Sequence, residues 1–141
     1  MKVHLTRVDD AFHLTGKGTS DSLVHIDASE NIGGHNAGSR PMELLLMGLG
    51  GCSSIDVILI LKKQKQEIDD FNVIISGERE TIEGTQMKPF TSMNVHFELK
   101  GNVDAKKLKR AISMSMEKYC SATAQFQSST EITHSFEIMR R

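Results

Sequence analysis

The chain has 141 residues, with 17 Lys and Arg against 18 Asp and Glu, for a formal net charge of −1. Hydrophobic residues make up 38% and charged residues 25%, which is ordinary for a soluble folded protein and excludes a disordered chain. Nucleic-acid binders usually carry a basic surplus, so the balanced charge also argues against that class. We therefore expect one folded domain over residues 1–141.

The first residues are polar and contain no apolar run that would serve as a signal peptide, so we expect a cytoplasmic protein. In a reducing compartment, a cysteine pair is more often redox-active than structural. Only 2 cysteines are present, and no Cys-x-x-Cys or His-x-x-x-His spacing joins them to histidines. We therefore expect no metal centre and no cofactor.

The N-terminal third predicts three short strands, because polar and apolar residues alternate between turn-forming residues. Their ranges are Val3–Val8, Ala11–Thr15 and Leu23–Ile26. A loop rich in Gly, Asn and Ser follows, and its composition predicts either a surface segment or a cover over a site. Ser39 is then a candidate N-cap for a helix that starts near Pro41 and runs to about Gln66.

The segment Met42–Leu61 is apolar enough to be weighed as a membrane span. It contains Glu43 and Asp56, and a charge near the middle of a bilayer costs roughly 2.5–3.5 kcal/mol on insertion scales. We therefore interpret it as a helix covered by protein, and expect no membrane partner. Gly48, Gly50 and Gly51 disfavour the helix, so they predict a bend or a close neighbour just before Cys52.

The C-terminal half predicts two long strands, Phe71–Glu83 and Thr91–Gly101, which alternate as an antiparallel pair with one covered face. A second helix follows from Ala105 to about Tyr119, capped by Asp104. Another short helix after Cys120 and a last strand, Ile132–Met139, complete the chain. These elements together predict an α+β fold.

The two cysteines occur in different settings. Cys52 lies among Gly and Ser residues that leave room for a small reactant. Cys120 opens a helical segment, and a helix N-terminus favours the thiolate. The alternative for each is an inert small hydrophobic residue, because free cysteine is often buried. Sequence separation does not show whether the two sulfurs meet.

Two segments carry a family resemblance. The run from Arg40 to Val57, with a proline opening an apolar helix that holds Cys52, resembles the central signature of the OsmC/Ohr superfamily. The segment Glu117–Thr123 around Cys120 resembles the second cysteine segment of that family. The resemblance implies an OsmC-like fold, in which antiparallel sheets wrap long central helices in an intertwined homodimer. It also implies reduction of organic hydroperoxides by a Cys52 thiolate that Cys120 resolves, with a lipoyl-type dithiol as the reductant.

The chain departs from the hydroperoxide-reducing branch at the residues that activate the cysteine. That branch has an Arg in the N-terminal β region and a Glu directly after the proline. Here Lys17 stands in the β region, Met42 follows the proline, and Glu43 comes one residue later. One residue turns a helix by ~100°, so Glu43 would point in a different direction from the glutamate of that branch. The alternative role for Glu43 is an acidic residue that stabilises the N-terminus of the helix through the helix dipole.

Two further residues are candidates for activating Cys52 or lining the substrate pocket, beside Lys17 and Glu43. Arg40 is a candidate replacement for the missing arginine, and Asp56 lies one helical turn beyond Cys52. The departures leave a second functional hypothesis open. In it, a non-peroxidase OsmC-like dimer binds a small apolar ligand or senses redox state.

Overall fold

A computed structural model describes residues 1–139 of the chain. The fold is α+β, as predicted, and its residues form two compact units. The first comprises residues 1–45, and the second begins at residue 46. The long helix α1 (Pro41–Lys63) starts in the first unit and continues in the second. Each unit is described by itself.

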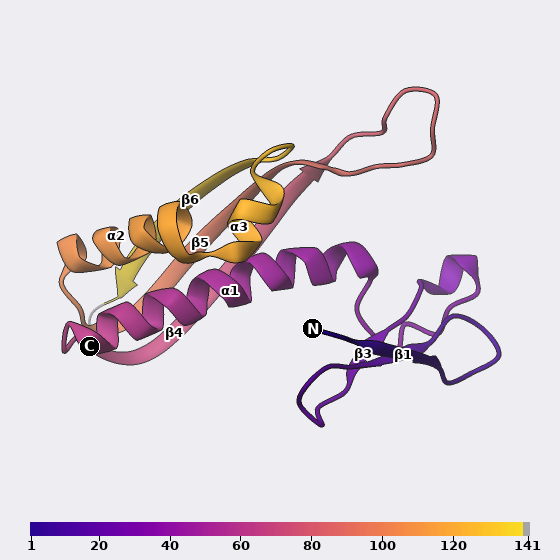
Figure 1. Cartoon of the computed structure of the whole chain (residues 1–141), viewed down its shortest axis with the longest axis horizontal. Coiled ribbons are helices and arrows are strands. Elements are labelled where there is room, and N and C mark those ends of the chain that lie inside the picture. The colour runs from indigo at the N-terminus through magenta and orange to yellow at the C-terminus, as the bar shows by residue number, and fades with distance from the viewer. Residues whose placement is uncertain (140–141) are drawn as a thin grey trace. The chain divides into compact units, whose positions relative to one another are not determined.

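The first unit is built on a small antiparallel sheet with strand order β1-β2-β3 (Figure 1). Its strands are β1 (His4–Arg7), β2 (Leu14–Lys17) and β3 (Val24–Ile26), followed by the 3-10 turn η1 (Glu30–Ile32). The second strand starts later than predicted. The carboxylate of Asp9 accepts hydrogen bonds from the backbone N–H groups of Ala11 and His13, which closes a turn over the residues expected to begin the strand.

The start of α1 differs from the expected Ser39 cap. The helix begins at Pro41, and Glu43 Oε1 accepts a hydrogen bond of 2.8 Å from the backbone N–H of Arg40. Glu43 therefore supplies the returning half of a capping box. Ser39 instead bridges to Ile26 beside β3. The prediction of Ser39 as the N-cap is therefore wrong, because its backbone is already committed to that pairing.

The second unit contains a three-stranded sheet of order β4-β5-β6, formed by β4 (Glu67–Arg79), β5 (Phe90–Asn102) and β6 (Glu131–Met139). β4 and β5 pair antiparallel, as predicted. β6 runs parallel to β5, so the sheet is mixed rather than antiparallel throughout. The reason is the helical connection between them, which returns the chain to the end of the sheet where β5 began.

That connection consists of α2 (Ala105–Met114), the π turn η2 (Ser115–Tyr119) and α3 (Ser121–Phe126). Asp104 caps α2 as predicted, since its side chain accepts a hydrogen bond of 3.0 Å from the N–H of Lys107. The helix expected to continue to Tyr119 changes character after Met114. The widened turn ends with a 2.7 Å bond from the N–H of Cys120 to the carbonyl of Ser115.

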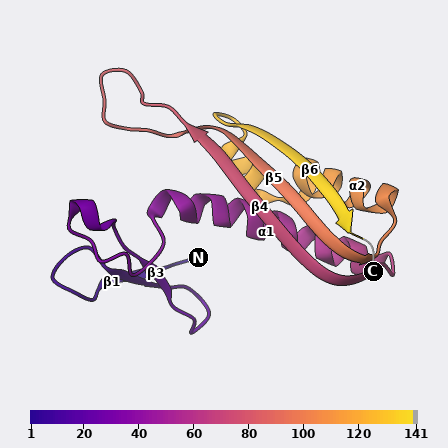
Figure 2. The ribbon, with the colours of Figure 1, turned by 180° about the vertical axis from the view of Figure 1, so that it is seen from behind.

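Within the second unit, the helices lie on one face of the sheet, as the two opposite views agree (Figures 1 and 2). The inward side chains of β5 form the centre of the core, and α1 and α2 each contribute buried residues to it. The largest fully buried apolar side chains are Leu49, Val57, Leu61, Met93, Val95, Phe97, Leu99, Leu108 and Ile112. Gly50 is required here, because an added Cβ would lie 2.3 Å from Cδ1 of Ile75.

Much of the apolar surface of α1 is left exposed by the described residues of the second unit. The helix is long and apolar enough to cross a membrane by length and composition, and only 33% of its most apolar window is buried. Met47, Ile55, Ile58 and Leu59 are exposed, with Ile55 at 68%. The apolar surface of this helix thus extends beyond the stripe that the sheet and α2 bury.

Candidate functional site

Three reactive side chains of the second unit converge at one point. The sulfurs of Cys52 and Cys120 and a carboxylate oxygen of Asp56 all lie within 4.8 Å of one another. Cys52 and Asp56 lie one turn apart on α1, while Cys120 comes from the junction between η2 and α3. Residues far apart in the sequence are therefore brought together, and both cysteines are free thiols.

The two thiols differ in their surroundings. Cys120 is only 5% exposed and caps α3, where its sulfur accepts a hydrogen bond of 3.4 Å from the N–H of Thr123. Burial raises the pKa of the Cys120 thiol, and the neighbouring Cys52 acts in the same direction, against hydrogen bonds from Thr123 that lower it. Cys52 is only partly buried. The accessible thiol is therefore Cys52, and Cys120 is the sheltered one.

Asp56 is held by a residue that the sequence analysis did not single out. The hydroxyl of Ser115, which is fully buried, donates a 2.9 Å hydrogen bond to Oδ2 of Asp56, and its oxygen also lies 3.4 Å from the carbonyl of Ser53. A signal for this role exists in the sequence. Ser115 follows Ile112 by three residues on the face of α2 that also buries Leu108, so a polar side chain stands where the helical period expects an apolar one.

The π turn places these groups. Ser115 is the first residue of η2 and keeps the helical phase of α2, which directs it to Asp56 on α1. The widened turn that follows takes the chain out of the helix at Cys120. Insertions of this kind in helices are frequent at functional sites. The sulfur of Met116, next to Ser115, accepts a 3.8 Å contact from the hydroxyl of Thr123, whose N–H donates to the sulfur of Cys120. The turn thus positions both Asp56 and Cys120.

A cavity of about 550 Å³ opens beside this cluster and includes Asp56 in its wall. Its apolar side is formed by Leu59, Ile60, Met114 and Tyr119. Lys63, Gln64 and Arg110 complete the lining. The Oε1 atom of Gln64 is buried and has no hydrogen-bond partner among residues 1–139. The cavity therefore combines an apolar wall with two cationic side chains.

The other predicted site residues belong to the first unit. The Arg40 guanidinium donates to the backbone carbonyls of Asp27 and Gly38 and, at 2.9 Å, to the side chain of Asn36. Lys17 pairs with Asp21 at 3.0 Å on the surface. Glu43 caps α1, which is the alternative role considered for it. Their part in activating Cys52 stays a prediction, while their observed contacts are structural.

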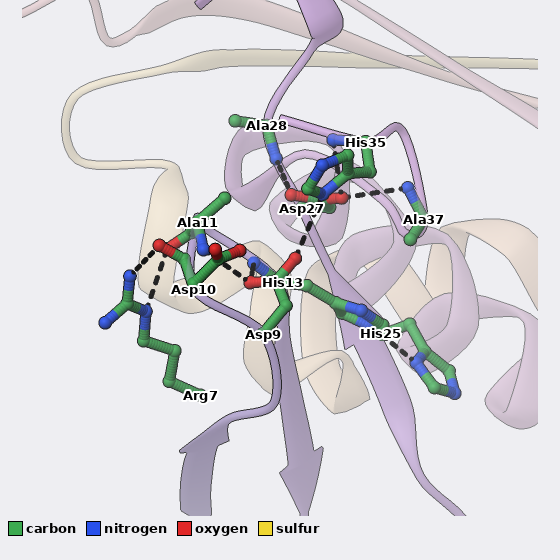
Figure 3. A network of polar contacts seen from close by, with 10 residues as sticks. All are labelled: Arg7, Asp9, Asp10, Ala11, His13, His25, Asp27, Ala28, His35 and Ala37. Atoms are coloured by element: carbon green, nitrogen blue, oxygen red, sulfur yellow. Dashed lines mark hydrogen bonds and ion pairs between the residues drawn. The ribbon is translucent and has the colours of Figure 1, made fainter. Parts of the chain in front are cut away.

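Asp27 organises the loop before α1 (Figure 3). Its side chain is 1% exposed, and its oxygens accept hydrogen bonds from the N–H groups of Ala28, His35 and Ala37. These hydrogen bonds, of which the one from Ala37 has the largest effect, hold the pKa of Asp27 below its ordinary value. Burial acts in the opposite direction and would raise it. Nearby, the His35 ring lies 3.0 Å from Asp9. The loop is thus held in a defined conformation by hydrogen bonds to buried and partly buried carboxylates.

The fold and the site together describe a small α+β protein in which two free thiols meet between a long apolar helix and a helical turn. Comparison with known families shows which family has this arrangement. A model described as "OsmC-like protein" matches residues 34–135. The chain therefore belongs to the OsmC-like family, which confirms the resemblance seen in the cysteine segments.

Individual relatives agree with this assignment. Protein YhfA of Escherichia coli K12 is 39% identical over 108 residues, covering 74% of this chain and 78% of YhfA. A hypothetical protein from Aquifex aeolicus VF5 superimposes with a TM-score of 0.83 at 32% identity, covering 99% of this chain and 96% of that chain. An organic hydroperoxide resistance protein from Elizabethkingia anophelis gives a TM-score of 0.72 at 15% identity, covering 99% and 97%. This last likeness shows the shared fold.

Proposed function

We propose that this protein is a thiol-dependent redox enzyme that reduces organic hydroperoxides, with Cys52 as the attacking thiolate and Cys120 as the resolving thiol. The observation that carries the proposal is the approach of the two sulfurs to within 4.8 Å, with one thiol accessible and the other buried. An attacking thiol needs access to its substrate, whereas a resolving thiol only has to reach the oxidised partner. The setting is a reducing cytoplasm.

The reaction takes place in three balanced steps. The Cys52 thiolate attacks the terminal oxygen of the hydroperoxide, the O–O bond breaks, and the alkoxide leaves and takes up a proton as an alcohol. Cys52 becomes a sulfenic acid. The Cys120 thiol then condenses with it to a disulfide and releases water. A dithiol of the lipoyl type reduces the disulfide by exchange, and is itself oxidised to its disulfide.

The raised pKa of Cys120 fits this division of labour. Burial keeps the Cys120 thiol protonated beyond its ordinary range, which suits a group that waits for a sulfenic acid. The cavity beside Asp56 supports an organic rather than an inorganic substrate, because Leu59, Met114 and Tyr119 offer apolar contacts to an alkyl group. The name of the Elizabethkingia protein, which refers to organic hydroperoxide resistance, points to the same class of substrate.

We further propose that the working form is a homodimer. The exposed apolar face of α1, with Met47, Ile55 and Ile58 at its centre, has no cover within residues 1–139. Added Cβ atoms at Gly48 and Gly51 would meet nothing within 4 Å, so this side of the helix also lacks bulk. A second copy of the chain supplies a matching apolar surface by symmetry.

The test is a titration of the fully reduced protein with an alkyl hydroperoxide. We expect one equivalent to be consumed per chain, with loss of both thiols and a Cys52–Cys120 disulfide visible by mass spectrometry. Cys52→Ser abolishes consumption. Cys120→Ser still consumes one equivalent, but stops at the sulfenic acid, which a dimedone-type reagent traps. Oxidation of wild type no faster than that of a free thiol would refute the peroxidase function.

The cavity also favours a second candidate, a dimer that binds a small apolar ligand without reducing it. The cations Lys63 and Arg110 in the cavity wall provide polar contacts for such a ligand. The titration separates the two functions. A ligand-binding protein that lacks peroxidase activity leaves the hydroperoxide unchanged in solution, and its two thiols remain reduced.

A further inference from the structure

We propose that the reduced thiols of Cys52 and Cys120 and the carboxylate of Asp56 bind one thiophilic divalent cation, with Zn²⁺ as the best-fitting example. The three ligand atoms lie within 4.8 Å of one another. Zn–S bonds of ~2.3 Å and Zn–O bonds of ~2.0–2.2 Å, at tetrahedral angles, place two ligand atoms of one ion about 3.6–3.8 Å apart. The three atoms therefore have to approach one another by roughly 1 Å at most to hold an ion.

Asp56 is the residue that a redox role for the thiols leaves unexplained. Within residues 1–139, no Lys or Arg forms an ion pair with Asp56. Its carboxylate instead lies beside the two sulfurs, which are the soft ligands of a mixed sulfur and oxygen site. A divalent cation between the three groups uses each of them as a ligand.

The surroundings of the ligands are those of an ion site. Ser115, which is fully buried, donates its hydroxyl to Oδ2 of Asp56 and leaves Oδ1 for an ion. The N–H of Thr123 donates to the sulfur of Cys120. Partners of this kind orient metal ligands and strengthen binding in known centres. Both are supplied by the helical connection that includes the π turn, so the support is built into the fold.

The cavity reaches the cluster at Asp56, and the partly buried Cys52 is the accessible thiol. Asp56 forms part of the wall of the space of about 550 Å³, and Cys52 is only partly buried. An ion with three protein ligands and an open position for water or a small ligand is the arrangement of reactive zinc sites. Tetrahedral coordination by two sulfurs and one oxygen also favours zinc over harder cations.

A second group of potential ligands serves as an internal comparison. His96, Glu98 and Glu137 also bring their ligand atoms within 4.8 Å on neighbouring strands. This group contains no sulfur, and the His96 ring is hydrogen-bonded to Ser135 at 2.8 Å. It therefore lacks the soft ligands that select a thiophilic ion, and Glu137 provides a matched control for Asp56.

Ion binding and disulfide formation exclude each other, because both use the same two sulfurs. Binding itself does not depend on the proposed function, but release by oxidation rests on it. The cation with its two bound thiolates, one hydroperoxide and two protons give the disulfide, an alcohol, water and the free cation. The bound ion thus keeps the two thiols from forming a disulfide, and oxidation by a hydroperoxide releases the ion.

The test uses the full-length reduced protein, stripped of metal and kept anaerobic, and titrated with Co²⁺ as a spectroscopic probe for Zn²⁺. We expect one ion per chain, with a thiolate-to-cobalt charge-transfer band that Zn²⁺ abolishes by displacement. Cys52→Ser and Cys120→Ser each reduce the band. Asp56→Asn weakens the affinity for Zn²⁺ at least about tenfold, since even groups outside the ligand shell are worth 10–100-fold. Glu137→Gln leaves both readouts unchanged.

Absence of the charge-transfer band in wild type overturns the proposal. Unchanged affinity in Asp56→Asn overturns the three-ligand site, and circular dichroism establishes that the variants are folded. A parallel hydroperoxide titration of the metal-free protein separates this inference from the proposed function. Ion binding without hydroperoxide consumption supports the metal site and refutes the proposed peroxidase function. Hydroperoxide consumption without ion binding supports the peroxidase function and refutes the metal site.

Discussion

Ser115, on the π turn that follows α2, donates a hydrogen bond of 2.9 Å to Asp56 on α1. The serine is fully buried, and the aspartate lies beside both cysteines. The bond links the helical connection to the central helix and fixes one carboxylate oxygen next to the thiols. Asp56 is thereby given the hydrogen-bonded partner that a partly buried carboxylate requires.

Ser115→Ala tests this link. Hydrogen bonds to charged groups contribute about 1.5–3 kcal/mol, so we expect the free energy of unfolding in urea to fall by about that amount. The loss has two causes, because Asp56 loses its partner and the deleted hydroxyl leaves a small void. The matched control is Ser128→Ala, at an exposed position, where the change stays within about 0.5 kcal/mol. Equal stability of the two variants would contradict the role of Ser115.

Gly50→Ala tests the close approach of α1 to the sheet. The new Cβ would lie 2.3 Å from Cδ1 and 2.7 Å from Cγ1 of Ile75, so the neighbour has to move. Overpacking of this kind costs about 1–3 kcal/mol, which exceeds the gain of up to about 1 kcal/mol from the better helix former. We expect a net loss in urea unfolding.

The double variant Gly50→Ala with Ile75→Val provides the control for this contact. Valine lacks the Cδ1 atom that lies closest to the new Cβ. We therefore expect the double variant to lose less free energy of unfolding than the sum of the losses in the two single variants. Strict additivity would show that the helix and β4 do not press on each other at this point.

The residues that were read correctly from the sequence are those whose signal is local. Asp104 caps α2, as its position before an amphipathic segment indicates. The alternation in β4 and β5 likewise predicts an antiparallel pair. The direction of β6 was not predicted, because strand alternation is the same in parallel and antiparallel sheets. Only the path of the connecting helices decides it.

In the candidate site too, the sequence identifies individual residues but not the contacts between them. Cys52 and Cys120 were singled out by family resemblance, and their approach is a tertiary fact that no spacing contains. Ser115 was missed although it lies on the buried face of its helix, because its partner Asp56 belongs to another helix and no sequence spacing shows that the two meet. Arg40 was proposed as a replacement for the arginine of the hydroperoxide-reducing branch, and this role stays a prediction. Its guanidinium donates to carbonyls of the preceding loop, contacts that no sequence pattern predicts.

Asp27→Asn changes the acid stability of the first unit. Because its folded pKa lies below its ordinary value, Asp27 contributes stability that is fully present above the unfolded pKa and is lost as pH falls through the lower, folded pKa. In wild type, we expect amide exchange at His35 and Ala37 to accelerate as the pH drops below about 3.8, when opening of the loop becomes easier.

The Asp27→Asn variant should exchange these amides faster at neutral pH and lose the acid-dependent step. Its side chain keeps one acceptor oxygen but lacks the charge that the three N–H groups stabilise. Asp21→Asn is the matched control, because this fully exposed carboxylate pairs only with Lys17 on the surface. An acid-dependent step that survives in Asp27→Asn would assign it to another group.

Ile55→Asp tests the dimer. Ile55 is 68% exposed in the single chain and lies on the uncovered apolar face of α1, so in a dimer the new carboxylate would be buried without a partner. Burying an ion costs several kcal/mol, and about 3 kcal/mol already weakens association roughly a hundredfold. We expect sedimentation equilibrium to give twice the chain mass for wild type and the mass of one chain for the variant. The control is Ile74→Asp on β4, which is 54% exposed but lies away from α1, and which should remain dimeric. A monomeric wild type would refute the proposed dimer, and a dimeric Ile55→Asp would place its interface elsewhere than on this face of α1.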